Sequence, residues 1–319
     1  MNRRQLIAYP TFASLAQLSW AQSGKPIRLI VPFPAGGPTD LVARVVAEPL
    51  GKLLGQPVLV DNRGGAGGSL GMAELARAQP DGLTLGIASV STHGVNPAVY
   101  KKLPYDPIKD FSPVTEFVKA PMTLVVHPSL GVDSMAGFIT YLKKNPGKVS
   151  YGSPGNGTTG HMLAELFKSA TNTFMLHIPY RGTGPAMVDL LGGQIQAYFD
   201  QVASSIPHIK SGKLRSLAVS WHQRLAVLPQ VPTFAEASLF ANNNSSWFGL
   251  VAPSKTPQAD INRIQKGVLK VIAEPDIKER FAQLGLFATG SSPDEFARLI
   301  QKEIDTMSRV AKFAKIHLD

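Results

Sequence analysis

The sequence contains no cysteine among its 319 residues, which excludes disulfide bonds and thiolate metal ligands. Charged residues are scarce at 17%, whereas hydrophobic residues make up 44%. Beyond the N-terminal segment, no apolar run approaches the ~20 residues that a membrane-spanning helix requires. The composition therefore indicates a globular chain with a sizeable core, long enough for two domains.

Catalytic and metal-binding signatures are also lacking. The seven histidines show no metal-ligand spacing, so we expect no metal site. Ser153 and His161 could serve as a nucleophile and its base, but the G-x-S-x-G elbow of many hydrolases is absent. We therefore expect no catalytic residues.

The charge balance is basic, with 32 lysines and arginines against 22 acidic residues and a formal net charge of +10. Such an excess can indicate a nucleic-acid partner. Here the basic residues are scattered, with no run of five or six and no interleaved aromatic residues. This pattern is typical of a solvated basic surface, and we expect no nucleic-acid binding.

The N-terminal segment has the features of a secretory signal. Arg3 and Arg4 precede an uncharged, largely apolar stretch. Ser19 and Ala21 are the small residues that a cleavage site requires at positions −3 and −1. We predict that residues 1–21 form a signal peptide, removed on export by either the general or the twin-arginine route. A frayed N-terminal tail is the alternative.

Short apolar runs alternate with helical patterns along the rest of the chain. Expected strands cover 27–33, 57–61, 83–88, 122–126, 149–151, 174–178, 195–199, 217–220 and 247–252. Helical patterns lie between most of these runs. Strand–helix repetition of this kind predicts parallel sheets with helices on both faces.

The C-terminal part is helical and cannot form a domain alone. Ser292 and Glu295 form a capping-box pattern that opens a final helix. We expect these helices to pack back onto the first part of the chain, which then crosses between domains near residues 120 and 250. The predicted fold is α/β, with two lobes, parallel-rich sheets and a ligand cleft between them. The predicted first lobe is 22–122 plus 250–319, and the second is 123–249.

Two loops share one physical design, because 33–39 and 153–159 each join a strand end to a helix start. Helix N-termini expose unpaired N–H groups with partial positive charge, and glycine lets the backbone approach a ligand closely. Neither loop contains lysine or arginine, which suits a carboxylate better than a polyphosphate. A simple tight turn is the alternative for each loop. The candidate ligand-binding residues here are Phe33, Ala35, Gly36, Gly37, Ser153, Asn156, Gly157, Thr158 and Thr159.

Four further candidates lie near the same edge of the sheets. Tyr180, Thr183 and Asp200 follow expected strands, whose carboxyl ends face the ligand crevice in open α/β sheets. Asp200 is equally suited to capping the next helix. His161 lies in the first turn of a helix, either as a donor to a bound anion or as a surface histidine.

The segment Gly155 to Gly160 also matches G-x-G-x-x-G after a strand, the fingerprint of dinucleotide-binding domains. The next strand ends at Tyr180 and Arg181, without the acidic residue that holds the ribose of NAD. An NAD(P)-dependent oxidoreductase that uses this loop nevertheless remains the alternative to a binding protein.

Several motifs together resemble one known family, the Bug family of tripartite tricarboxylate transporter receptors. The similar stretches are 27–37, 103–107 with 109–111, 151–161, 207–215 and 231–236. The resemblance covers nearly the whole chain after the predicted signal peptide.

This resemblance implies a periplasmic Venus-flytrap receptor that closes over its ligand and docks on an ion-driven membrane permease. Ligands in the family are mostly mono- and dicarboxylates, amino acids and aromatic acids. It further implies that the loops 33–37 and 153–159 grip one carboxylate and that Asp200 is the pocket aspartate. We accordingly expect a monomer without cofactor or enzymatic activity.

Overall fold

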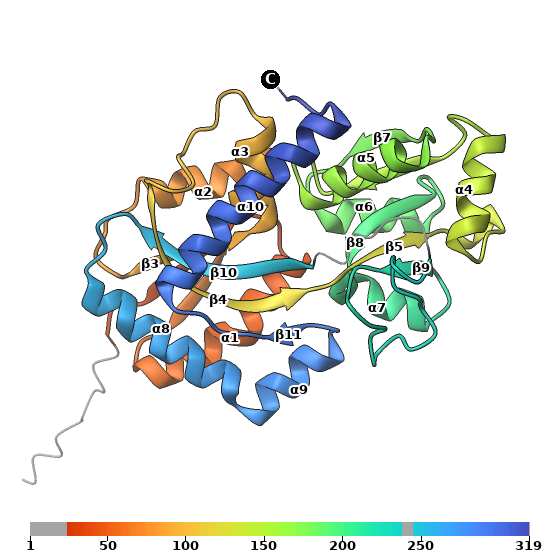
Figure 1. The fold of residues 1–319 in the computed structure, drawn as a ribbon. Coiled ribbons are helices and arrows are strands. Elements are labelled where there is room, and N and C mark those ends of the chain that lie inside the picture. Colours follow the sequence, from red (N-terminus) through yellow and green to blue (C-terminus); the bar gives the residue numbers. More distant parts are fainter. Residues whose placement is uncertain (1–23, 238–244, 319) are drawn as a thin grey trace, which may run out of the picture.

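The computed structural model describes residues 24–237 and 245–318, so the predicted signal peptide lies outside the described residues. The strands form two separate sheets, each covered by helices (Figure 1). Among the described residues, no helix combines the length and apolar character needed to cross a membrane.

The first sheet has six strands in the order β11-β4-β10-β3-β1-β2. Their bounds are β1 Ile27–Val31, β2 Val58–Asn62, β3 Thr84–Ser89, β4 Phe111–Ala120, β10 Ser246–Pro253 and β11 Phe287–Ala288. One face packs against α1 (Pro38–Leu54), α8 (Gln258–Ala273) and α9 (Pro275–Gln283). The other packs against α2 (Ser69–Ala76), α3 (Asn96–Val99) and α10 (Pro293–Ala314).

The second sheet has five strands in the order β7-β6-β8-β5-β9. Their bounds are β5 Met122–Val126, β6 Ser150–Ser153, β7 Leu176–Pro179, β8 Ala197–Gln201 and β9 Arg215–Val219. The core on one side includes residues of α4 (Met135–Lys144) and α5 (Thr159–Thr171). The other side is covered by α6 (Thr183–Leu191) and α7 (Val202–Lys210). Short helical turns, η1 (Ala66–Gly68), η2 (Ser91–Val95) and η3 (Pro128–Leu130), complete the described helices.

Both sheets are mixed, and the antiparallel pairs occur where the chain passes between them. Within the βα units, β1 pairs in parallel with β2 and β3, and β6 does so with β7 and β8. By contrast, β10 runs antiparallel to β3 and β4, and β5 runs antiparallel to β8 and β9. β4 leads directly across into β5 (Figure 1). The predicted boundaries of the two lobes stay a prediction.

Strand β4 is the main element that the sequence pattern misses. Ser112 and Pro113 interrupt its apolar start and look like a break between segments. In the structure, Pro113 pairs with Val251 of β10 beside a register shift. Proline lacks the N–H that a regular ladder needs, and such an irregularity is where a strand tolerates it.

Helix α10 begins at the predicted capping box. The Ser292 hydroxyl accepts the N–H of Glu295, and the Glu295 carboxylate accepts the N–H of Ser292, so the pattern is confirmed. The helix returns to the first sheet, where Phe296 fills the space over Gly249 of β10. Met162 of α5 joins the same apolar cluster. A helix of the second sheet therefore packs against the helical layer of the first.

Candidate ligand-binding site

The loop between β1 and α1 ends at Gly37, which precedes the helix without any side-chain cap. Gly36 adopts a left-handed conformation with φ of 80°, which favours glycine. Its N–H donates to Asp40 Oδ2 at 2.9 Å. The Gly36 amide is thus already bonded to the first turn of α1. The N-terminus of α1 faces the second sheet, because a Cβ built on Gly37 would lie 3.9 Å from the Thr183 side chain.

The loop between β6 and α5 is organised by its own hydroxyl groups. Thr158 Oγ1 donates to the Gly155 carbonyl oxygen at 2.7 Å. Ser153 Oγ accepts the Gly155 N–H at 3.2 Å and lies 2.7 Å from His177 Nε2. The hydroxyl groups of Ser153 and Thr158 therefore stabilise the shape of the loop.

The N-terminus of α5 is capped from the other sheet. Thr158 occupies the N-cap position but its side chain makes no cap hydrogen bond. The Thr159 N–H instead donates to Ser91 Oγ at 3.0 Å, and the two hydroxyl oxygens lie 2.9 Å apart. Ser91 belongs to η2, which follows β3 of the first sheet.

A narrow cavity of about 40 Å³ lies where these loops meet. Hydroxyl groups and phenylalanine rings from both sheets line it, together with the acceptors Asp200 and Gln201 of the second sheet. The lining residues are Phe33, Pro34, Gly37, Pro38, Thr39, Ser89, Ser91, Met122, Pro154, Thr159, Gly160, Thr183, Phe199, Asp200, Gln201 and Phe248. No lysine or arginine is among these lining residues.

Five of the predicted site residues line this cavity, namely Phe33, Gly37, Thr159, Thr183 and Asp200. Asn156 and Tyr180 instead line a neighbouring cavity of about 370 Å³, which shares Phe33, Pro34 and Pro154 with the first. The remaining predicted residues line neither of these two cavities: Ala35, Gly36, Ser153, Gly157, Thr158 and His161. The structure thus separates candidate contacts from residues that shape the loops.

Four polar residues of the cavity are not among the predicted site residues, and one of them, Thr39, lies within the predicted loop 33–39. Ser89 and Ser91 end β3 and begin η2, and Gln201 ends β8. β3 is parallel to β1, so its carboxyl end lies at the same edge. Ser89, like Asp200, lies at the carboxyl end of a strand, so the position of strand ends in the sequence identifies both residues.

The acceptor side of the cavity is buried and electrostatically unusual. Asp200 is 3% exposed, and its Oδ2 accepts hydrogen bonds from Ser204 and Ser205, each at 2.6 Å. Burial raises the pKa of Asp200 to about 6, although both hydroxyl bonds favour ionisation. Gln201 Oε1 is also buried, without a hydrogen-bond partner in the described part of the chain. A ligand group that donates hydrogen bonds would satisfy Gln201 Oε1.

His161 lies behind the second loop and not in the narrow cavity. Its ring stacks on His177 with centroids 4.3 Å apart, and its Nδ1 accepts the Gly157 N–H at 3.4 Å. Burial lowers the pKa of both rings, that of His177 to about 4. Neutral imidazoles keep an acceptor for the loop, so this pair is suited to supporting the loop.

Comparison with known proteins decides which family this site belongs to. Residues 42–316 match the receptor family of the tripartite tricarboxylate transporters, TctC. The chain belongs to the TctC family. Protein BugT of Bordetella pertussis is 37% identical over 289 residues, which cover 90% of this chain and 89% of BugT. The predicted resemblance to Bug receptors is thereby confirmed.

Solved structures agree with this TctC assignment. A structure described as a periplasmic transporter has a TM-score of 0.91 and 45% identity, covering 93% of this chain and 100% of its own. An R. palustris protein solved with adipate has a TM-score of 0.89 at 34% identity, with 92% and 98% covered. MatC of Rhodopseudomonas palustris, with bound malate, has a TM-score of 0.86 at 31% identity, with 90% and 98% covered. The α/β periplasmic-binding-protein fold is confirmed.

None of these TctC relatives supports the dinucleotide alternative, and the structure gives the glycines another purpose. The described chain has two halves, one built on the first sheet and one on the second. A Cβ at Gly157 would lie 2.6 Å from the Tyr100 ring, so glycine is required for the close approach of the two halves. Tyr100 Oη also donates to the Asn156 carbonyl oxygen at 3.1 Å. The motif Gly155–Gly160 therefore packs against the first half of this TctC receptor.

Proposed function

We propose that this protein is a periplasmic receptor that binds a small carboxylate between its two sheets and delivers it to an ion-driven membrane permease. This proposal rests on the narrow cavity, which borders the N-terminal turns of α1 and α5. Several hydroxyl groups line it, and no lysine or arginine is among the lining residues. Helix N-termini favour anions through their unpaired N–H groups and partial positive charge. The site binds without catalysis and without a cofactor.

The ligand carries a hydrogen-bond donor in addition to its carboxylate. Thr39 offers a donor to an anion, and the bonded pair of Ser91 and Thr159 hydroxyls leaves one more O–H proton free to donate. Asp200 and Gln201 offer buried acceptors. A hydroxyl, an ammonium or a protonated second carboxyl group fits those acceptors. The solved relatives with malate and adipate support this class of acid.

The size of the cavity favours a compact acid. Its volume of about 40 Å³ is far below the roughly 300–1,000 Å³ of drug-sized pockets. A longer acid would extend past Pro34 and Pro154 into the neighbouring cavity of about 370 Å³, where Asn156, Tyr180 and Arg181 lie. The two cavities therefore distinguish acids by the length of the ligand's carbon chain.

We further propose that the lobes comprise 22–122 plus 250–319 and 123–249, and that they close around the ligand as a monomer. Residues 1–21 direct export and are then removed. The hydrogen bonds between Ser91 and Thr159 and between Tyr100 and Asn156 join the two halves and stabilise closure.

A ligand screen of the chain from Gln22 onward tests the function. Malate, adipate, succinate, aromatic acids, amino acids and NAD(P)H are compared by thermal shift, then by calorimetry. A ligand at ~100 times its Kd adds about 2.7 kcal/mol of stability, which such a screen detects. Stabilisation by carboxylates supports the receptor. The proposed receptor function is contradicted if only NAD(P)H stabilises the protein, or if no carboxylate does.

A matched pair of variants locates the site. Thr183→Val removes a hydroxyl that lines the narrow cavity, with little change in volume. Thr306→Val removes a half-buried hydroxyl on α10, outside the residues that line the cavity, and serves as the control. Weaker carboxylate binding in the first variant alone places the ligand in this cavity.

A further inference from the structure

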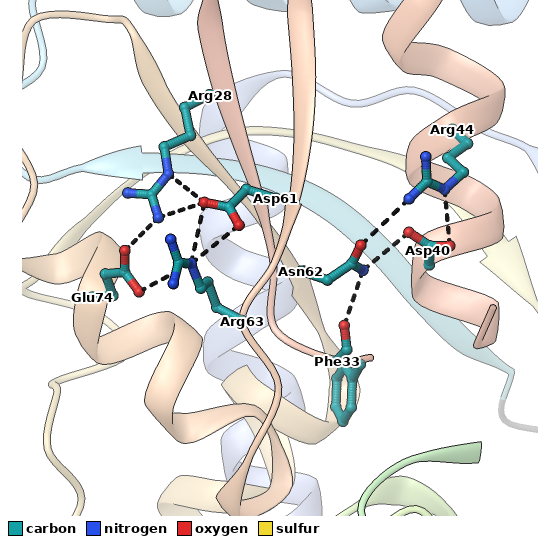
Figure 2. A network of polar contacts seen from close by, with 8 residues as sticks. All are labelled: Arg28, Phe33, Asp40, Arg44, Asp61, Asn62, Arg63 and Glu74. Atoms are coloured by element: carbon teal, nitrogen blue, oxygen red, sulfur yellow. Dashed lines mark hydrogen bonds and ion pairs between the residues drawn. The ribbon is translucent and has the colours of Figure 1, made fainter. Parts of the chain in front are cut away.

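The ligand loop Phe33–Gly36 is held at both ends by two side chains that do not line the cavity. Asn62 Nδ2 donates to the Phe33 carbonyl oxygen at 3.0 Å, and the Gly36 N–H donates to Asp40 Oδ2 at 2.9 Å. Asn62 Nδ2 also donates to Asp40 Oδ1 at 3.0 Å, so the two holding groups are bonded to each other (Figure 2).

Asp40 is a buried carboxylate in the first turn of α1, 3% exposed. Burial raises its pKa, but the hydrogen bonds from Arg44 and the Gly36 amide outweigh that effect, so the pKa lies below its ordinary value. Arg44 Nε donates to Asp40 Oδ2 at 2.9 Å, although the arginine side chain is 54% exposed. The carboxylate therefore stays ionised and accepts hydrogen bonds only.

We propose that Asp40 and Asn62 are positioning residues that fix the loop for ligand binding, an inference that rests on the proposed carboxylate site. The loop contains Gly36 at positive φ and is followed by a second glycine, so its backbone has unusual freedom. Bonds at Phe33 and Gly36 remove that freedom before the ligand arrives. Preorganisation of this kind lowers the entropic cost of binding.

The neighbouring residue Asp61 provides a matched control. Asp61 and Asn62 are adjacent on β2, and their side chains point to opposite sides of the strand (Figure 2). Asp61 accepts hydrogen bonds from Arg28 at 2.7 Å and Arg63 at 3.1 Å, and Arg28 also pairs with Glu74 of α2. This ion-pair cluster ties β2 to α2 and does not reach the ligand loop.

Three variants test the proposal. Asn62→Ala deletes the two hydrogen bonds that Nδ2 donates and the one that Oδ1 accepts from Arg44 at 3.4 Å. Asn62→Asp keeps the shape of the side chain but sets a carboxylate against Asp40 and the Phe33 carbonyl. Asp61→Asn weakens the ion pairs on the other side of the same strand. Hydrogen exchange across residues 33–41 is measured without ligand, and Kd is measured for malate and adipate by calorimetry.

In Asn62→Ala, we expect faster exchange at the Gly36 amide and a Kd about fivefold to tenfold higher, the usual effect of losing a buried hydrogen bond. Asn62→Asp should raise both the loop exchange rate and Kd more than Asn62→Ala does, because the new carboxylate faces that of Asp40. Asp61→Asn should leave loop exchange and Kd within about twofold, even where it lowers the melting temperature.

Unchanged loop exchange in both Asn62 variants overturns the positioning role. An equal loss of affinity in Asp61→Asn also overturns it, because the effect would then follow stability alone. If exchange rises as expected while the wild-type protein binds neither acid, the loop contacts are supported and the proposed ligand class fails. The two hypotheses are thus distinguished by separate measurements.

Discussion

Ser91 of the first half caps helix α5 of the second half, accepting the Thr159 N–H at 3.0 Å. The hydroxyl oxygens of the same two residues lie 2.9 Å apart, at positions 68 residues apart in the sequence. The cap is therefore a contact that exists only when the two halves are together. Both residues line the narrow cavity, so the proposed ligand would contact the same groups that join the two halves.

Replacing Ser91 with alanine should loosen closure. The uncapped α5 N-terminus is expected to lower the free energy of unfolding by about 1 kcal/mol, as for other helix caps. Urea denaturation measures that loss, and small-angle scattering should show a more expanded ligand-free protein. Ser211→Ala, on an exposed turn, is the control. A Ser91 variant with wild-type stability and dimensions would show that the cap does not stabilise closure.

Gly157→Ala should impair ligand binding more than folding. Its Cβ would lie 2.6 Å from the Tyr100 ring at a φ of 71°, so the two halves could not approach fully. We expect weaker carboxylate binding with little change in secondary structure, measured by calorimetry and circular dichroism. Gly184→Ala in α6 is the matched control, because nothing lies within 4 Å of its Cβ. Equal affinity in both variants would contradict the steric argument.

Asp200 should make the protein less stable as pH rises. Burial moves its pKa from 3.8 to about 6, so between these values the folded state binds more protons than the unfolded state. Stability contributed by the protonated form is therefore lost between about pH 4 and pH 6, by an amount on the order of 3 kcal/mol. Asp200→Asn should remove this slope and be more stable at pH 7.

The measurement is urea unfolding of wild type and Asp200→Asn from pH 4 to 7, compared as a difference so that other titrating groups cancel. Asp133→Asn, at an exposed position, serves as the control. A difference between wild type and Asp200→Asn that is independent of pH would mean that the buried carboxyl titrates normally.

His177 should have the opposite pH dependence. Burial lowers its pKa from 6.5 to about 4, so the folded state binds fewer protons than the unfolded state between these values. The stabilising contribution of the neutral ring is present above about pH 6.5 and is lost as pH falls toward 4. An NMR titration of the His177 ring measures this pKa. A His177 ring that is half-protonated near pH 6.5 in this titration would refute the prediction.

The local patterns of the sequence predicted most elements of the fold. Alternating apolar runs located most strands, and the Ser292–Glu295 capping box marked the start of α10. The glycine-rich junctions identified both loops that meet at the cavity, because a strand end followed by a helix start is a local feature. β4 escaped because Pro113 breaks the local pattern, while its pairing with β10 is a long-range contact.

The sequence by itself determined the α/β fold, the family and the two loops, since these follow from local periodicity and recognisable motifs. Only the tertiary structure decided which donors face the cavity. It bonds the Gly36 amide to Asp40, places Ser91 on the α5 N-terminus and stacks His161 on His177. The last two contacts join residues far apart in the sequence, and the Ser91 contact satisfies an N–H that the local pattern leaves open. A buried polar group needs a hydrogen-bond partner, and only the folded chain brings a distant partner within reach.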